Sequence, residues 1–273
     1  MRMTQHFKLS SAVRRLRRAS PADLKRWITT FPVVLSAPPI LGTVDALCQV
    51  FPESTRDEAE RIAGEFSAET HLHSQLESIM LQKRGRQMDW QEWHPFLYGA
   101  IRMMRPRVVL ETGVFDGRSS ALILAAMARN EVGELVSIDL PAIHEIPDAT
   151  DRIRGGSSLP KGCDPGWLVP EYLRERYRLR LGDSKELLPS LLRQYGKIDV
   201  FLHDSLHTYE HQWFEYRTVW PHMVEGGLFL SDDIFWSAAF HRFARQKRLT
   251  YVNLGNFGAA RVGSGAVARP STA

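Results

Sequence analysis

The sequence predicts an α/β protein with a doubly wound, mostly parallel sheet and a helical N-terminal region. From residue 107 onward, short apolar runs alternate with helical stretches, which is the pattern of right-handed crossovers between parallel strands. Before residue 107, segments with helical patterns are separated by turn signals. We therefore expect a helical region at residues 1–93 and the sheet domain at residues 94–273.

The helical region carries two start signals. Thr55 with Glu58 forms a capping-box pattern, which predicts one long polar helix to about Gln82. Asp89 is placed to cap a second helix, rich in aromatic residues, that ends before Pro106.

Five strands are expected in the second region, and the residues that end them decide the function. In a parallel sheet, ligands bind outside the carboxyl ends of the strands, at the switch point. The expected strands are residues 107–111, 135–139, 177–181, 198–203 and 227–231.

Composition narrows the class of protein. The 273 residues are 44% hydrophobic and 24% charged, which fits a folded chain with a proper core and excludes wholesale disorder. No uncharged apolar run of about 18 residues occurs, so we expect no membrane-spanning helix. Cys48 and Cys163 are the two cysteines; they are too few for a disulfide framework and indicate reduced thiols in a cytoplasmic protein.

Positive charge is concentrated at the start of the chain. Residues 1–30 hold eight Lys or Arg and one acid, Asp23. A basic amphipathic leader suits an anionic membrane surface or nucleic acid. The other interpretation, which we favour, is a solvated helix that contacts a partner subunit of a homo-oligomer or nothing. No basic stripe interleaved with aromatic residues follows it, so we expect no nucleic-acid partner.

The first strand ends in a glycine-containing segment from Glu111 to Gly117. Gly113 and Gly117 allow a tight turn and a close backbone approach to a ligand. A dinucleotide fingerprint would need glycines where Phe115 and Arg118 stand, so that match fails. The acids of this segment favour a ligand with positive charge. S-adenosylmethionine, which has a sulfonium, an ammonium and no phosphate, meets that requirement.

The next two strand ends suit the rest of such a cofactor. Asp139 ends the second strand and can accept hydrogen bonds from both ribose hydroxyls; acids also follow strands merely as turn residues. Gly182, Asp183 and Ser184 follow the third strand. Asp183 is placed to accept from an adenine amino group or to cap the next helix, and the two roles are compatible.

Carboxylates follow the fourth and fifth strands. Asp204 ends one, and Asp232 and Asp233 end the other. Neighbouring strands lie about 4.8 Å apart, so these groups would repel one another unless a cation or protons compensate them. Oxygen ligands suit magnesium, manganese or calcium. The alternative makes Asp232 and Asp233 helix caps and Asp204 a solvated turn residue; we favour the metal.

His207 lies three residues after Asp204. A histidine titrates near neutral pH and is a competent general base for a hydroxyl whose acidity a metal has raised. The alternative is that His207 caps or covers the following helix.

Together these residues resemble the class I S-adenosylmethionine-dependent methyltransferases. The acid-x-Gly-x-x-x-Gly pattern at 111–117, then Asp139, then residues 182–184, recur there in this order. Residues 203–210 and 231–234 are similar to a bacterial subgroup of small-molecule O-methyltransferases, of the metal-dependent sugar and catechol types. The resemblance covers roughly residues 94–262. It implies a Rossmann-like sheet of seven strands, whose last hairpin would be formed by two further segments, residues 249–253 and 257–262.

The resemblance also implies roles for single residues. Glu111 and Gly113 would hold the methionine part of the cofactor, Asp139 the ribose and Asp183 the adenine end. The full set of implied cofactor-binding residues is Glu111, Thr112, Gly113, Gly117, Ser119, Asp139, Gly182, Asp183 and Ser184. The implied metal ligands are Asp204, Asp232 and Asp233. His207 stands where catechol-type relatives have a lysine base and where the macrolide sugar type has a histidine.

The sequence therefore predicts an S-adenosylmethionine-dependent methyltransferase. We expect metal-assisted methylation of a small-molecule hydroxyl, with Mg²⁺ or Mn²⁺ and with His207 and Asp204 as catalytic residues. Two alternatives are a metal-independent methyltransferase on the same fold and a catalytically inert module that binds a nucleotide or a partner. Retention of His207 and of all three carboxylates argues against the inert module.

Overall fold

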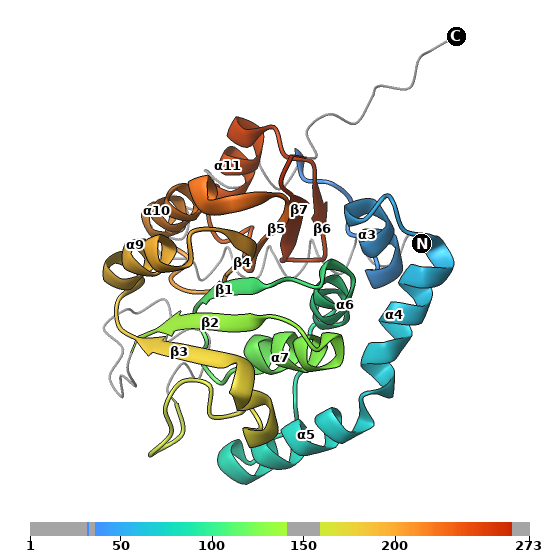
Figure 1. The fold of residues 1–273 in the computed structure, drawn as a ribbon, viewed down its shortest axis with the longest axis vertical. Helices are drawn as coiled ribbons and strands as arrows, with labels where there is room; N and C mark the ends of the chain where they lie inside the picture. The colour runs from blue at the N-terminus through green and yellow to red at the C-terminus, as the bar shows by residue number, and fades with distance from the viewer. Residues whose placement is uncertain (1–31, 33–35, 141–158, 264–273) are drawn as a thin grey trace, which may run out of the picture.

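The sheet is the centre of the molecule, and helices cover both of its faces (Figure 1). The computed structural model describes residues 32, 36–140 and 159–263. Its seven strands lie in the order β3-β2-β1-β4-β5-β7-β6. They are β1 Val108–Thr112, β2 Glu134–Asp139, β3 Tyr177–Leu181, β4 Ile198–His203, β5 Met223–Ser231, β6 Tyr251–Asn253 and β7 Gly258–Arg261.

Pairing within the sheet confirms the mostly parallel architecture. Strands β1 to β5 pair in parallel, and β7 is antiparallel to both β5 and β6. The expected C-terminal hairpin is therefore present. The strand order reverses at β1, whose neighbours are β2 and β4, and parallel sheets bind ligands at such a switch point.

Two hydrophobic cores lie on opposite faces of the sheet, because successive side chains of a strand point to opposite sides. Val109 belongs to one core and Leu110 to the other. The first core contains helices α3 Thr43–Val50, α4 Arg56–Ala68, α5 Thr70–Arg84, α6 His94–Met104 and α7 Arg118–Asn130. The second contains α9 Ser184–Tyr195, α10 Tyr209–Val219 and α11 Ala239–Lys247. The first core includes residues from both sides of the domain boundary expected at residue 94, so the N-terminal helices and the sheet are packed together.

The helical region differs from the sequence prediction in two places. Thr55 caps α4, since its hydroxyl accepts from the backbone N–H of Glu58 at 3.2 Å, but the expected long helix is divided into α4 and α5 at Glu69. The Glu69 carboxylate accepts from Tyr98 at 2.8 Å and from Arg129 at 2.9 Å. These tertiary contacts hold the bend.

The second difference concerns Asp89, which does not cap the next helix. That helix, α6, begins at His94 with Trp93 as its N-cap residue and a proline in its first turn. Asp89 instead belongs to the connection between α5 and α6, which forms part of the site described below.

Within the described residues, no helix is long and apolar enough to cross a membrane. The basic segment 1–30 and its expected contacts lie outside the described residues.

Candidate active site

The loop after β1 is packed against the protein's own backbone. Gly113 has φ +84°, and a Cβ there would lie 2.0 Å from the carbonyl oxygen of Asp204. Gly117 has φ +91°, and a Cβ there would lie 2.7 Å from Cα of Gly166. The close approach that these glycines permit is thus used to seat the loop on the end of β4 and on the segment around residue 166, rather than being left open for a ligand.

Glu111 lies beneath this loop, fully buried. Its carboxylate accepts hydrogen bonds from the hydroxyls of Ser119 and Ser120 at 2.6 Å and of Ser137 at 2.7 Å. Burial raises its pKa, although the three hydroxyls oppose that shift. In this arrangement Glu111 ties the start of α7 to β2, and Ser119 donates its hydroxyl to this internal contact.

Asp139, at the end of β2, holds the same loop from the other side. Its Oδ2 accepts the backbone N–H groups of Val114 at 2.8 Å and Phe115 at 2.7 Å, and its Oδ1 accepts that of Leu140. Burial raises the pKa of this carboxyl. The predicted ribose ligand is therefore also a support of the loop after β1.

The residues after β3 have mainly structural contacts. Asp183 is the N-cap of α9, and its Oδ1 accepts the backbone N–H of Lys185 at 2.8 Å, which confirms the capping role. Ser184 is buried and donates to Glu215 at 2.6 Å. Gly182 packs against Leu187, which lies 2.8 Å from the position of a Cβ.

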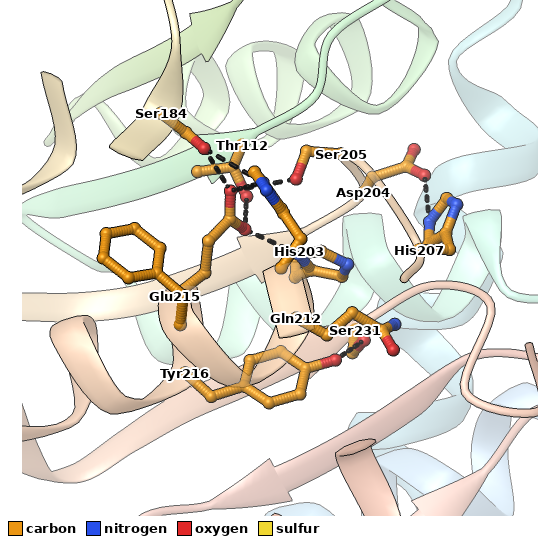
Figure 2. Close-up of polar contacts among 12 residues, drawn as sticks. Thr112, Ser184, His203, Asp204, Ser205, His207, Gln212, Glu215, Tyr216 and Ser231 are labelled. Atoms are coloured by element: carbon orange, nitrogen blue, oxygen red, sulfur yellow. Dashed lines mark hydrogen bonds and ion pairs between the residues drawn. The ribbon is translucent and has the colours of Figure 1, made fainter. Parts of the chain in front are cut away.

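Glu215 on α10 is the centre of a buried hydrogen-bond network that was not predicted from the sequence (Figure 2). It is fully buried, and although burial disfavours its charge, His203 and His211 hold its pKa well below the ordinary value. Donors from three strand ends converge on its two oxygens at 2.6 to 2.9 Å: Thr112, Ser184, His203, Ser205 and His211. The four-residue spacing of His211 and Glu215 on one helix face was the available signal. Thr112, a predicted cofactor ligand, is thus part of this network.

The ends of β4 and β5 bring together a second group of polar side chains. Ligand atoms of Asp204, His207 and Asp232 all lie within 4.8 Å of one another, and the Asp232 N–H donates to the carbonyl of His203 at 2.9 Å. The pKa values of both aspartates are raised well above the ordinary value, first by desolvation and then by repulsion from neighbouring carboxylates, Asp233 among them. This arrangement is suited to a cation.

Asp233, the third predicted ligand, is turned toward other partners. It has φ +51°, a left-handed conformation that is uncommon for residues other than glycine. Its Oδ1 accepts from the Asn256 amide, and its Oδ2 lies 3.4 Å from Nδ1 of His207. Nε2 of His207 lies 3.6 Å from Oδ1 of Asp204. In the structure, His207 takes the third place beside Asp204 and Asp232, where Asp233 was expected.

A cavity of about 680 Å³ opens in front of these carboxylates. Its walls are the loop after β1 with the start of α7, the ends of β4 and β5, the connection between α5 and α6, and the turn between β6 and β7. The lining residues are Asp89, Trp90, Gln91, Glu92, Trp93, His94, Val114, Phe115, Asp116, Arg118, Ser119, Asp204, Asp232, Asp233, Leu254, Gly255 and Asn256.

Only some of the predicted site residues line this cavity. Asp139, Asp183 and His207 are not among its lining residues, so the expected adenosine ligands lie along the same sheet edge but outside it. The wall from residues 89–94 was not predicted, because it belongs to the region expected only to form helices.

Asp116 does not offer free negative charge to this cavity. Its carboxylate accepts from Nε of Arg84 at 3.0 Å and from Nε1 of Trp167 at 2.8 Å. The guanidinium of Arg84 also lies 5.0 Å from the centre of the Phe115 ring. The attraction expected between Asp116 and a positively charged ligand is therefore compensated by the protein itself.

Comparison with known families matches one part of the chain. The model of a family described as a methyltransferase domain matches residues 110–234, the segment from β1 to the residues that follow β5. Residues 110–234 therefore form a methyltransferase domain of the S-adenosylmethionine-dependent class. In this methyltransferase the matched segment contains every predicted site residue, and the N-terminal helices and the last hairpin lie outside it.

Solved structures similar to this chain include several methyltransferases. A putative caffeoyl-CoA O-methyltransferase from Staphylococcus aureus has a TM-score of 0.50 and 13% identity, covering 72% of this chain and 96% of that chain. An O-methyltransferase from Bacillus cereus in complex with SAH has a TM-score of 0.49 and 14% identity, covering 69% and 90%. The O-methyltransferase TomG from Streptomyces achromogenes, involved in tomaymycin synthesis and in complex with SAM, has a TM-score of 0.48 and 16% identity, covering 70% and 89%. No curated protein matched the chain.

Proposed function

We propose that this methyltransferase transfers the methyl group of S-adenosylmethionine to a hydroxyl oxygen of a small molecule, with the assistance of Mg²⁺ or Mn²⁺. The observation that supports this most directly is the convergence of Asp204, His207 and Asp232, two of which, Asp204 and Asp232, line the cavity. The Staphylococcus aureus protein with this fold is named as a putative O-methyltransferase, which agrees with oxygen as the acceptor atom.

The residues at the ends of β4 and β5 fit a divalent cation. Asp204 and Asp232 are half-buried; burial and nearby carboxylates raise both of their pKa values, Asp233 acting on both and Asp204 on Asp232. A bound hard cation would relieve this repulsion. A cation held by these two carboxylates would lower the pKa of an acceptor hydroxyl beside it. Asp233, engaged by Asn256, would support His207.

The remaining residues bind, orient and exclude water. S-adenosylmethionine supplies an electrophilic methyl group on its sulfonium. Asp139 and Asp183 would hold the ribose and adenine ends, and the loop after β1 would carry the methionine end. The walls formed by residues 89–94 and 254–256 would hold the acceptor oxygen about 3 Å from the methyl carbon, in line with the bond that breaks.

Two roles of His207 at this site can be distinguished by experiment. As the general base predicted from the sequence, it would use Nε2, with Nδ1 facing Asp233. Its place within 4.8 Å of the two aspartates, and its absence from the cavity lining, favour a second role as a third cation ligand. Loss of a base would lower the rate by about 10²–10⁴-fold and leave cation affinity unchanged, whereas loss of a ligand would weaken cation binding first.

The test uses purified protein, S-adenosylmethionine with a labelled methyl group, and pooled hydroxyl acceptors. Chelator should abolish transfer, and Mg²⁺ or Mn²⁺ should restore it. Full transfer in chelator would support the metal-independent alternative, and failure to bind the cofactor would support the inert module. His207→Ala and His207→Asn, compared by Mn²⁺ affinity and by the pH dependence of the rate, assign the role of the histidine.

We further propose a cytoplasmic enzyme that assembles as a homo-oligomer and has no nucleic-acid partner. Cys48 and Cys163 are both free thiols in the structure, in agreement with a reducing compartment. Size-exclusion chromatography with light scattering would test the assembly, since a monomer at working concentration would contradict it.

A further inference from the structure

His94, on the cavity wall, has one ring nitrogen for which the described part of the chain provides no acceptor. The residue lines the cavity and is only 1% exposed. Its Nδ1 accepts the backbone N–H of Gln91 at 2.7 Å, so the proton of the neutral ring is on Nε2. Nε2 is not among the fully enclosed polar atoms that lack a partner in the described residues, so its open side faces the cavity. A desolvated donor without an acceptor is costly, and this arrangement is expected where a ligand supplies the acceptor.

Neighbouring side chains fix the position and the neutral state of this ring. The ring centroids of Trp93 and Trp90 lie 4.2 and 5.5 Å from that of His94, and Trp93 in turn stacks on Phe257 at 4.4 Å. Desolvation, with a smaller contribution from Arg118, lowers the pKa of His94 to about 3. The ring is therefore uncharged at neutral pH. Because Nε2 carries a proton, it cannot ligate a cation, and its partner must be an atom that accepts a hydrogen bond.

We infer that Nε2–H of His94 donates a hydrogen bond to a second oxygen of the methyl acceptor, distinct from the oxygen that is methylated; the inference rests on the proposed function. His94 begins α6 and lies outside the segment 110–234, which contains every predicted cofactor-binding residue. Asp204 and Asp232, the proposed cation ligands beside the reacting hydroxyl, line the same cavity. The acceptor is thus a compound with two oxygen functions: a hydroxyl at the cation and a hydroxyl, ether or carbonyl oxygen at His94. A site built for such a hydrogen bond discriminates against an analogue that lacks the oxygen.

The experiment varies only the second oxygen of the ligand. Catechol, resorcinol and hydroquinone have two oxygens at three separations, and phenol has one; the cyclohexanediols and cyclohexanol repeat the comparison without an aromatic ring. Dissociation constants are measured by calorimetry at neutral pH, on protein saturated with S-adenosylhomocysteine and Mg²⁺. At least one two-oxygen compound should bind the wild type more tightly than its one-oxygen analogue.

Two variants of His94 separate its two nitrogens. His94→Asn keeps an acceptor for the N–H of Gln91 but does not reach the position of Nε2. It should weaken binding of that two-oxygen compound by about 3- to 10-fold and change binding of the one-oxygen analogue by less than about twofold. His94→Gln carries an amide N–H about as far as Nε2 and should restore most of the affinity. Binding of S-adenosylhomocysteine should be unchanged in both variants.

The matched control is His241→Asn. Nδ1 and Nε2 of His241 lie 2.8 Å from the Tyr251 hydroxyl and the Ile234 carbonyl, and His241 does not line the cavity. Its replacement should leave the affinity for every compound unchanged, and an equal loss in this variant would overturn the inference.

Three further results would overturn the inference. One is a wild type that binds no two-oxygen compound more tightly than its one-oxygen analogue. Another is equal weakening of both compounds in His94→Asn, and the third is weakened binding of S-adenosylhomocysteine, which would assign the donor to the cofactor. A wild type that does not bind S-adenosylhomocysteine would instead contradict the proposed function. If thermal melting shows that His94→Asn is unfolded, the two-oxygen compound must shift the Nε2–H resonance of His94 in ¹⁵N-histidine-labelled wild type, and an unshifted resonance overturns the inference.

Discussion

Carboxylates at the same edge of the sheet have pKa values shifted in opposite directions. Glu215 is fully buried and accepts hydrogen bonds from five side chains, and its pKa lies well below the ordinary value because His203 and His211 outweigh burial. Asp204 and Asp232 are half-buried at the cavity, and their pKa values lie well above the ordinary value because of desolvation and repulsion from neighbouring carboxylates.

The difference separates scaffold from site. A carboxylate surrounded by protein donors has its charge satisfied within the protein and fixes the elements that supply those donors. Carboxylates that crowd one another are destabilising until something else compensates them, and such perturbed groups in a cavity are characteristic of functional sites. Glu215 thus holds the strand ends in place, and Asp204 with Asp232 is where a ligand is needed.

The largest effect is expected for the scaffold. Glu215→Gln puts an amide among five donors and should lower the free energy of unfolding by about 3–5 kcal/mol, as when one partner of a buried ion pair is removed. Urea denaturation measures it. The control, Glu210→Gln on an exposed position of the same helix, should stay within about 0.5 kcal/mol of the wild type. A loss under about 1 kcal/mol for Glu215→Gln would remove the distinction between the two groups.

The buried histidine His94 provides the next test, through the pH dependence of the free energy of unfolding. His94 is buried, and desolvation lowers its pKa to about 3, while its Nδ1 accepts the N–H of Gln91 at 2.7 Å. In the unfolded chain the imidazole of this residue takes up a proton below about pH 6.5. Its contribution to the free energy of unfolding is therefore fully present above that pH and is lost as the pH decreases toward 3. The slope should approach about 1.4 kcal/mol per pH unit for this group.

His94→Gln measures that contribution. The free energy of unfolding of this variant, measured by denaturation from pH 7 to pH 4, should decrease less steeply than that of the wild type. The difference in slope should be up to about 1.4 kcal/mol per pH unit. Parallel curves would show that His94 accepts a proton in the folded state.

The crowded pair should respond in the direction opposite to Glu215. Without a divalent cation at pH 8, Asp204→Asn or Asp232→Asn should raise the free energy of unfolding by about 1 kcal/mol, since each removes a repulsive charge. A carboxyl with a raised folded-state pKa destabilises above that pKa, so the gain should disappear as the pH falls and the wild-type carboxyl takes up a proton. Destabilised variants would mean that these aspartates are scaffold residues like Glu215.

The smallest effect concerns the second role of Asp183. Asp183→Ala should cost about 1 kcal/mol through loss of the α9 cap, and Asp183→Ser, which still caps, should cost less. If Asp183 also binds adenine, both variants should weaken binding of S-adenosylhomocysteine by a similar factor. Unchanged binding in Asp183→Ser would leave only the cap.

Much of the fold was predictable because its signals are local. Strand positions, the parallel architecture and the final hairpin follow from periodicity, turn residues and the resemblance to methyltransferases, and the structure confirms them. The division of the long helix at Glu69 was not predictable, because the contacts that hold it come from Tyr98 and Arg129, 29 and 60 residues away.

The location of the site in the fold was predictable from the sequence, but many of the contacts made by its residues were not. The strand ends placed Asp204 and Asp232 together, since the carboxyl ends of parallel neighbours share one edge. The hydrogen-bond partners of each carboxylate oxygen depend on the tertiary structure. For this reason the internal partners of Glu111 and the contact of Asp233 with Asn256 were not predicted from the sequence. The cavity wall at residues 89–94 was missed for the same reason.

Calorimetric titration of the purified protein with Mn²⁺ measures whether Asp204 and Asp232 bind a cation. We expect one site in the wild type, strong loss of binding in both Asp204→Asn and Asp232→Asn, and unchanged binding in Glu92→Gln, a carboxylate elsewhere in the cavity wall. Cation binding at these aspartates would be wrong if the wild type bound no Mn²⁺ in the presence of S-adenosylhomocysteine, or if both aspartate variants bound Mn²⁺ as tightly as the wild type.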